Sequence, residues 1–137
     1  MDIKVSHAST ENGRVPITII HVDGNLDSAT YDEFQTKAEE LIKGGARFIL
    51  IDLAHAPYVS SGGLRAIHHI FKTLNSIHPD ATLKDEEIKD GINAGTYKSP
   101  YLKVTNLSSE SKYVFKTTGF DMYIESFDDM KKAIAAF

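Results

Sequence analysis

Residues 47–74 read RFILIDLAHAPYVSSGGLRAIHHIFKTL, and this stretch decides the fold class. Residues 47–53 are mostly apolar, which predicts a buried strand. The polar turn Ser60-Ser61-Gly62-Gly63 follows, and an apolar residue then recurs at the spacing of one helix face, at Leu64, Ile67, Phe71 and Leu74. A strand, a tight turn and a helix in this order predict an α/β unit, in which the free N–H groups of the helix start face the turn.

The N-terminal part of the chain predicts two strands and a helix. Ile3 and Val5 indicate a short first strand, residues 11–13 indicate a hairpin turn, and the β-branched run 15–22 indicates a buried second strand. The Thr30-x-x-Glu33 spacing is typical of a capping box. We expect a helix to follow and to end at Gly44-Gly45, with an apolar face made by Phe34, Ala38, Leu41 and Ile42.

The C-terminal part predicts two strands and two helices after an irregular stretch. Residues 76–100 are interpreted as an inserted segment, with a short helix around 85–94. We expect a strand at 101–104, a helix capped by Ser108 and stopped by Gly119, a last strand at 122–124, and a closing helix capped within 126–129. The inner face of that closing helix is expected to carry Met130, Ala133, Ile134 and Phe137. Without repeats or linkers, residues 1–137 are interpreted as one domain, a mixed β-sheet with helices packed on it.

Composition narrows the class of protein. The chain has 137 residues, 42% of them hydrophobic and 25% charged, which fits a single core. It has no cysteine, so disulfides and thiolate chemistry are excluded and a reducing compartment is favoured. The net charge is −4 with scattered basic residues, so we expect a protein partner and neither nucleic acid nor a lipid surface. Residues 1–5 lack the pattern of a secretory signal, and no apolar run approaches the roughly 20 residues of a membrane span. We therefore expect a cytoplasmic location.

The turn at residues 60–63 is the main candidate for chemistry. Two hydroxyls at a helix start lie near unpaired backbone donors and the positive end of the helix dipole. Three interpretations stay open: a serine that caps the helix, a serine that is phosphorylated, or a catalytic nucleophile. The nucleophile is disfavoured because the leading glycine of a Gly-x-Ser-x-Gly elbow is missing. His68 and His69 lie about 10 Å or more along the helix from Ser61, whereas His21 and His55 stay open as bases.

Other polar residues suggest structure rather than catalysis. Asp27 either caps the next helix or approaches the serine turn across the strand ends, and capping is the safer interpretation. His68 and His69 are adjacent and point about 100° apart on a helix, which does not suit a metal site. The carboxylates at 85–87 and 128–129 are interpreted as a solvated segment and a helix cap. We expect no metal, no cofactor and no catalytic residue.

Together these pieces resemble the STAS domain, the fold of bacterial anti-sigma factor antagonists, over nearly the whole chain. Gly24-Asn25-Leu26-Asp27 matches the family's Gly-x-Leu-Asp, residues 48–53 match its central strand, and residues 58–65 match its phosphorylation turn. Gly119-Phe120 matches a glycine and apolar residue before the last strand. The combination is more specific than any one motif.

The resemblance implies a phosphorylation-regulated switch. In such antagonists an unphosphorylated serine or threonine permits binding to an anti-sigma factor, often itself a serine kinase, which then releases its sigma factor; phosphorylation reverses this, and a phosphatase is a further partner. The phosphoacceptor falls on Ser61, and its surroundings and the partner-binding surface fall on Asp27, Ser60, Gly62, Gly63 and Leu64. Ser60 stands where the family often has Asp, so both neighbouring hydroxyls remain candidates.

Two other functions compete with the switch. One is a STAS scaffold or ligand-sensing module without a phosphoswitch, with its contacts in the inserted segment. The other is an enzyme or nucleotide hydrolase that uses Ser61 and a histidine, but the sequence has no Walker-type phosphate loop. We therefore expect that the protein is not an enzyme.

Overall fold

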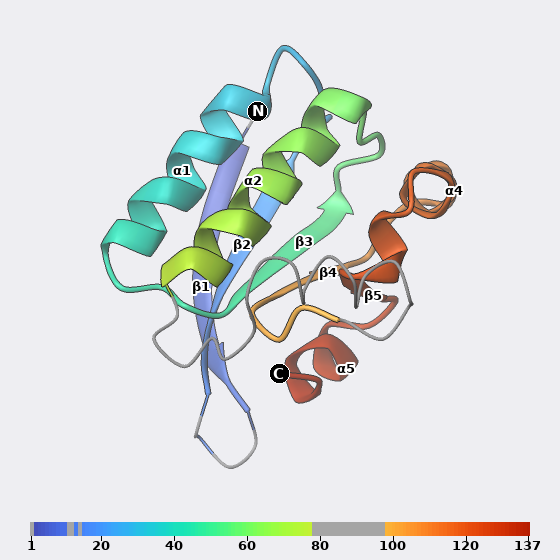
Figure 1. The fold of residues 1–137 in the computed structure, drawn as a ribbon. Helices are drawn as coiled ribbons and strands as arrows, with labels where there is room; N and C mark the ends of the chain where they lie inside the picture. The colour runs from blue at the N-terminus through green and yellow to red at the C-terminus, as the bar shows by residue number, and fades with distance from the viewer. Residues whose placement is uncertain (1, 11–12, 14, 78–97) are drawn as a thin grey trace.

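A five-stranded mixed sheet forms the centre of the computed structural model (Figure 1). The structure describes residues 2–10, 13, 15–77 and 98–137. The strands follow one another across the sheet as β1 (Asp2–Ser9), β2 (Pro16–Asp23), β3 (Ile49–His55), β4 (Leu102–Thr105) and β5 (Glu125–Phe127). β1 runs antiparallel to β2, and the other neighbouring strands are parallel. The expected α/β class with a mixed sheet is confirmed.

The central strands β2 and β3 are buried because both of their faces are covered. Ile20 on β2 lies beside Ile51 on β3, and neither is exposed to solvent. β3 begins two residues later than the sequence indicated, at Ile49 rather than Arg47. Arg47 instead donates from Nη1 to the carbonyls of Ile42 (2.9 Å) and Ala46 (2.8 Å). Its guanidinium therefore satisfies a carbonyl at the C-terminal end of the preceding helix.

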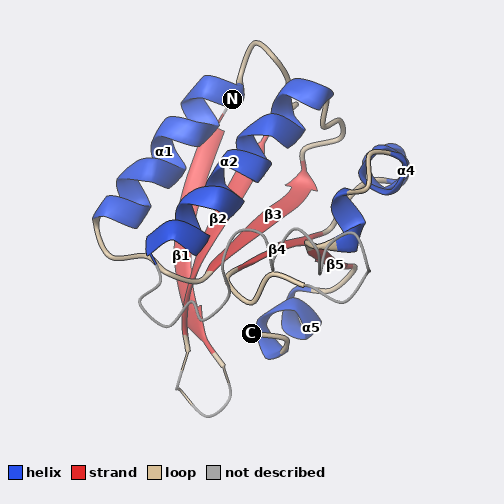
Figure 2. Ribbon diagram, in the orientation of Figure 1, coloured by secondary structure: helices blue, strands red, loops and turns tan. Residues whose placement is uncertain are grey.

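Two long helices cover one face of the sheet, as Figure 2 shows: α1 (Tyr31–Lys43) and α2 (Ser61–Ile77). The apolar periodicity of each predicted its buried face. The buried residues of α1 are Phe34, Ala38 and Ile42, with Leu41 partly buried against them. Those of α2 include Leu64, Ile67, Phe71 and Leu74. This layer holds the larger hydrophobic core.

The opposite face, called the back face here, is covered in part by α5 (Met130–Ala135). Met130, Ala133, Ile134 and Phe137 pack there against a second, smaller core, as their spacing predicted. Asp129 caps α5 by accepting from two backbone N–H groups. Ser108 caps α4 (Ser109–Thr117) by accepting from the Ser111 N–H (3.1 Å). Both predicted caps are confirmed.

The last strand was placed too early by the sequence. Residues 120–122 form the short 3-10 helix η1 (Phe120–Met122), and β5 begins only at Glu125. Gly119 turns the chain with φ 81°, and the Phe120 carbonyl then accepts from the N–H groups of Tyr123 (3.3 Å) and Ile124 (3.0 Å). The apolar signal at 122–124 arose because Tyr123 and Ile124 are core residues, not because they pair in the sheet.

The capping box at Thr30 is also wrong. Thr30 adopts helical backbone angles and makes no side-chain cap hydrogen bond. Its Oγ1 instead donates to the Asn25 carbonyl (2.7 Å) and accepts from the Asp27 N–H (3.0 Å). The first hydrogen-bonded turn starts earlier, since the Asp27 carbonyl accepts from the Tyr31 N–H (2.8 Å).

Part of the expected organisation lies outside the described residues. The short helix at 85–94 and most of the inserted segment fall within residues 78–97, and Glu11 and Asn12 of the hairpin turn are also not described. Gly13 of that turn has φ 68°, which suits a glycine in a tight connection. No helix among the described residues has both the length and the apolar character that a membrane crossing needs.

Candidate functional site

The start of α2 separates the two neighbouring hydroxyls. Ser60 precedes the helix, and its Oγ accepts a long hydrogen bond from the Gly63 N–H (3.4 Å), while its carbonyl accepts from the Leu64 N–H (2.9 Å). The Ser60 N–H donates to the Leu26 carbonyl (2.9 Å). Ser60 is therefore the N-cap of α2, a position that serine favours.

Ser61 is the first residue of α2, and its side chain is exposed. Its hydroxyl makes no hydrogen bond to any other residue that the structure describes. The first-turn N–H groups and the positive end of the helix dipole lie close to it, and both favour a negatively charged group. The helix cap and the candidate acceptor are thus two different residues.

Gly62 and Gly63 let the start of α2 pack tightly against the segment after β2. A Cβ on Gly62 would lie 3.0 Å from the Cα of Ser28, and a Cβ on Gly63 would overlap the Leu26 carbonyl. Leu26 also forms a β-bridge with Val59, which holds the two segments side by side. The glycines are therefore required for close approach, and the turn that they form is a packed helix start.

Asp27 lies in this neighbouring segment, and its carboxylate turns back into its own loop. Oδ1 accepts from the N–H of Ala29 (2.9 Å), and from the N–H (3.2 Å) and Oγ1 (3.2 Å) of Thr30. These hydrogen bonds lie in the turn before α1, whose N-cap position is Thr30, so Asp27 does not cap the helix itself as the safer interpretation expected. The fold brings the Asp27 segment beside the serine turn, while the carboxylate itself shapes the loop.

The remaining predicted site residue, Leu64, is only 2% exposed and belongs to the larger core. Its side chain packs α2 onto the core and therefore contributes little to the exposed surface beside Ser61. Ser28 is exposed next to Gly62 and lies beside this surface, and Tyr58, two residues before Ser60, is 43% exposed. Sequence analysis included Tyr58 in the matching turn but missed Ser28, because only the long-range pairing of Leu26 with Val59 brings the segment of Ser28 to the serine turn.

Residues 8–82 match the family model of the STAS domain, which is more than half of the 137-residue chain. The match includes β2, β3, α2 and the whole serine turn. The chain belongs to the STAS domain family.

Solved structures similar to this STAS domain share its fold at low sequence identity. An anti-sigma factor antagonist from Mycobacterium paratuberculosis has a TM-score of 0.66 and 14% identity, over 98% of this chain and 93% of that chain. The cell fate determinant SpoIIAA of Bacillus in its phosphorylated form has a TM-score of 0.59 and 13% identity, over 97% and 96%. A sulfate transporter family protein from Wolinella succinogenes has a TM-score of 0.58 and 15% identity, over 87% and 82%. No curated protein matches the sequence significantly.

The histidines on α2 of this STAS domain have partners other than Ser61. His68 Nδ1 lies 2.8 Å from the Tyr123 hydroxyl, and His69 Nε2 lies 2.8 Å from Glu39 Oε1 on α1. Burial, together with the nearby positive charges of Lys72 and His69, lowers the pKa of His68, and burial raises the pKa of Tyr123 to about 12. His68 is thus a half-buried histidine at the edge of the core.

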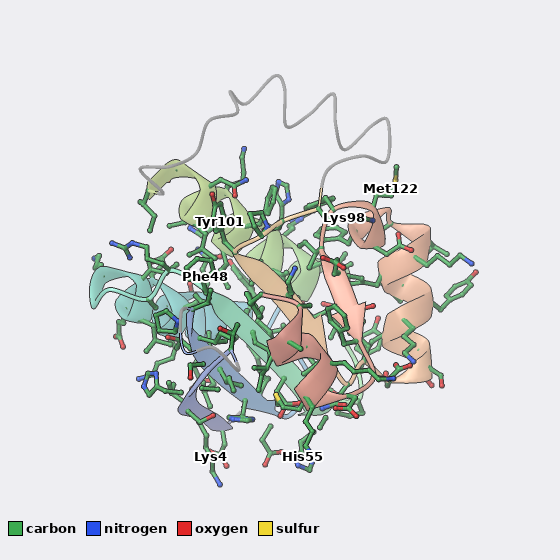
Figure 3. All side chains as sticks on the ribbon, turned by 90° about the horizontal axis from the view of Figure 1, so that it is seen from below. Lys4, Phe48, His55, Lys98, Tyr101 and Met122 are labelled. Carbon is green, nitrogen blue, oxygen red and sulfur yellow. The ribbon has the colours of Figure 1, made fainter. Side chains whose placement is uncertain are left out.

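Neither of the two histidines left open as bases makes a hydrogen bond to Ser61. His21 contacts Asp52 on the back face, with His21 Nδ1 at 2.7 Å from Asp52 Oδ2. His55 is exposed at the end of β3, as Figure 3 shows. The described residues contain no cluster of three or more His, Asp or Glu side chains that could hold a metal ion. Ser61 is thus an exposed hydroxyl with no hydrogen-bonded histidine among the described residues.

Proposed function

We propose that this STAS domain is an anti-sigma factor antagonist whose binding is switched by phosphorylation of Ser61. In the unphosphorylated state it binds an anti-sigma factor that is itself a serine kinase, and the sigma factor is released to direct transcription. Phosphorylation by the bound kinase ends the interaction, and a phosphatase restores it. The domain acts in the bacterial cytoplasm as a binding protein, and the catalytic step belongs to the kinase.

The observation that carries the proposal is the exposed Ser61 hydroxyl at the first position of α2. Ser60 is engaged as the helix cap through the Gly63 N–H, which favours Ser61 as the acceptor of the pair. The family membership and the fold shared with an anti-sigma factor antagonist support the same function. The fold is also shared with a protein solved in a phosphorylated form.

The physical basis of the switch is a change of charge on a contact surface. A phosphate adds about −1.5 to −2 charges and a strongly hydrated group at pH 7. The first-turn N–H groups of α2 tolerate that charge within the domain, so the fold is retained. A partner surface shaped for the neutral Ser61 hydroxyl, with Ser28 beside the turn, would have to bury the phosphate unpaired. Binding is therefore lost without unfolding.

The test incubates the protein with an anti-sigma factor serine kinase and ATP. Mass spectrometry is expected to find one phosphate, on Ser61, and calorimetry is expected to find that Ser61→Asp weakens binding roughly tenfold or more, about 1.4 kcal/mol. Ser109→Asp is a matched control, because Ser109 is an exposed first residue of α4 that also follows a serine cap. Phosphate on neither Ser60 nor Ser61, with Ser61→Asp binding unchanged, would end the proposal.

A second candidate is a scaffold or ligand-sensing STAS module without a switch. The shared fold with a sulfate transporter family protein favours it, since that protein carries the same fold in another context. Its contacts would lie in the segment that the sequence marks as an insertion. Replacement of residues 78–97 by a short linker then abolishes partner binding, while Ser61→Ala has no effect. The opposite pair of results supports the switch.

A further inference from the structure

Three polar side chains form a hydrogen-bonded chain on the back face, across three neighbouring strands. Ser6 on β1 places its Oγ 2.7 Å from His21 Nε2, and His21 on β2 places Nδ1 2.7 Å from Asp52 Oδ2 on β3. Alternation along each strand sets this face, because Ala8 and Leu50, two residues away from Ser6 and Asp52, pack in the back-face core. The chain lies on the side of the sheet opposite α2, so it is separate from the Ser61 site.

The far end of this chain fixes the Asp52 carboxylate. Asp52 Oδ1 accepts from Asn106 Nδ2 (3.0 Å) and from the Ala54 N–H (3.1 Å), which leaves Oδ2 for His21. Burial would raise the pKa of Asp52, but the hydrogen bonds from Asn106, His21 and Ala54 outweigh it and lower the pKa. Asn106 makes its contact from a left-handed backbone conformation, with φ 62°. A charged Asp52 thus faces the imidazole.

The charge of Asp52 sets the tautomer of His21. A carboxylate can only accept, so His21 Nδ1 carries the proton and Nε2 offers a lone pair to the Ser6 hydroxyl. Nucleophilic serines are activated by this arrangement of hydroxyl, imidazole and orienting carboxylate, on unrelated folds. The His21 side chain is 34% exposed and Ser6 is half-buried, so a small molecule can reach the pair.

We propose that Ser6 is an activated nucleophile that accepts an acyl group from small activated esters, with His21 as its base and Asp52 as the positioning residue. The Ser6 Oγ forms a bond to the ester carbonyl carbon as its proton passes to His21 Nε2. The bond from that carbon to the leaving oxygen then breaks, and His21 returns the proton to the leaving group. The product is an ester on Ser6 and a free alcohol or phenol.

Lys4 supplies positive charge beside this reaction. It lies two residues from Ser6 on β1, and so on the same face, and it pairs directly with His21 across the strands. Its side chain is exposed at the outer edge of the sheet, where Figure 3 labels it. A lysine ammonium here can stabilise the negative oxygen of the tetrahedral intermediate. The site is open rather than enclosed, which is why the proposed substrates are small.

The test is acylation of the full chain by 4-nitrophenyl acetate. We expect phenolate release with acetyl on Ser6 by peptide mass spectrometry, in a linkage that hydroxylamine cleaves as it does esters and not lysine amides. Ser6→Ala is expected to remove this acetyl group, and His21→Gln to slow its formation at least roughly tenfold, within the range of general-base contributions. Ser9→Ala, an exposed serine on the other face of β1, is the control and should change nothing.

The positioning role of Asp52 needs its own readout. Proton NMR is expected to show a downfield resonance of the His21 Nδ1–H that His21→Gln removes and Asp52→Asn shifts upfield, with acylation slowed in the same variant. Acetyl on Ser6 that forms no faster than on Ser9, or acetyl found only as amides, would overturn the proposal. Both outcomes leave the Ser61 switch untouched, because they involve the other face of the sheet.

Discussion

Gly63 in the first turn of α2 packs against the Leu26 carbonyl so closely that a Cβ would lie 2.4 Å from the oxygen. The same carbonyl accepts the Ser60 N–H. The start of α2 is thus joined to the segment after β2 by a hydrogen bond and by direct contact, and the exposed Ser61 lies on a rigid base. A partner that binds this surface therefore contacts a structure that is already formed in the free domain.

The first prediction is that Gly63→Ala destabilises the domain. The added methyl group overlaps backbone that is pinned by the pairing of Leu26 with Val59, so either α2 or the loop must move. Overpacking of this kind costs about 1–3 kcal/mol. Urea denaturation should show that loss. Gly44→Ala is the control, because its Cβ would be 3.4 Å from its nearest neighbour and its φ is −78°; an equal loss there would remove the explanation.

The second prediction separates Ser60 from Ser61 by stability alone. Ser60→Ala removes an N-cap and should cost about 1 kcal/mol, within the usual range of about 0.5–2 kcal/mol. Ser61→Ala removes an exposed hydroxyl and should stay within about 0.5 kcal/mol of the parent. Both are measured by denaturant unfolding in the absence of any partner. If Ser61→Ala proves the more destabilising, the assignment of the cap is wrong.

The third prediction is a loss of stability below pH 6.5 that depends on His68. Its folded-state pKa lies below the ordinary 6.5, so the unfolded chain binds the proton first as the pH falls. The contribution of His68 is complete above pH 6.5 and declines from there to its folded pKa, with a slope of at most about 1.4 kcal/mol per pH unit. The pKa of Asp52 lies below its ordinary 3.8, so protonation of Asp52 lowers the stability only at pH values below about 3.8.

Thermal unfolding between pH 7 and pH 5 checks this prediction. His68→Gln should remove the slope, whatever it does to stability at pH 7. Tyr123→Phe should keep most of it, because burial is the main cause of the lowered pKa of His68 and the ring of Phe preserves that burial. An unchanged slope in His68→Gln would assign the pH dependence to another group.

The fold was predictable where burial shows in the periodicity of the sequence. The continuous apolar runs of β2 and β3 and the helical spacing from Leu64 to Leu74 each reflect a face that must leave water. The same reasoning failed at Tyr123 and Ile124, which are buried although they lie between η1 and β5. An apolar triplet indicates burial and does not distinguish a strand from a turn that packs on the core.

The sequence located the candidate site, but it did not show which of the two neighbouring serines caps the helix and which is exposed. Neighbouring serines look alike until the first helical residue is known, and here that residue is Ser61. The need for Gly62 and Gly63 depends on Leu26 and Ser28, more than 30 positions away. The chain from Ser6 through His21 to Asp52 was out of reach for the same reason, because its members come from separate strands.

The fourth prediction concerns Lys103, a lysine that is only 2% exposed. Its Nζ donates to Glu125 Oε1 (2.9 Å) and to the Ser99 carbonyl (3.2 Å), and it lies 5.3 Å from the centre of the Phe137 ring. Glu125→Ala leaves the buried ammonium without its counter-ion and should cost about 1.5–3 kcal/mol, the range for hydrogen bonds to charged groups.

Lys103→Met should lower the free energy of unfolding less than Glu125→Ala does. A simple count of lost contacts would give the opposite order. Methionine fills a similar volume without a buried charge, and the Glu125 side chain, 40% exposed, regains water. Urea denaturation of both variants and of the double variant measures the difference, with the double variant expected near Lys103→Met. The exposed pair of Lys112 and Asp128 is the control, since solvent screens the pair and its loss should cost less stability than Glu125→Ala. A Lys103→Met variant that is less stable than Glu125→Ala would contradict this prediction. The ammonium would then stabilise the fold by more than neutralising Glu125, through its contacts with the Phe137 ring and the Ser99 carbonyl.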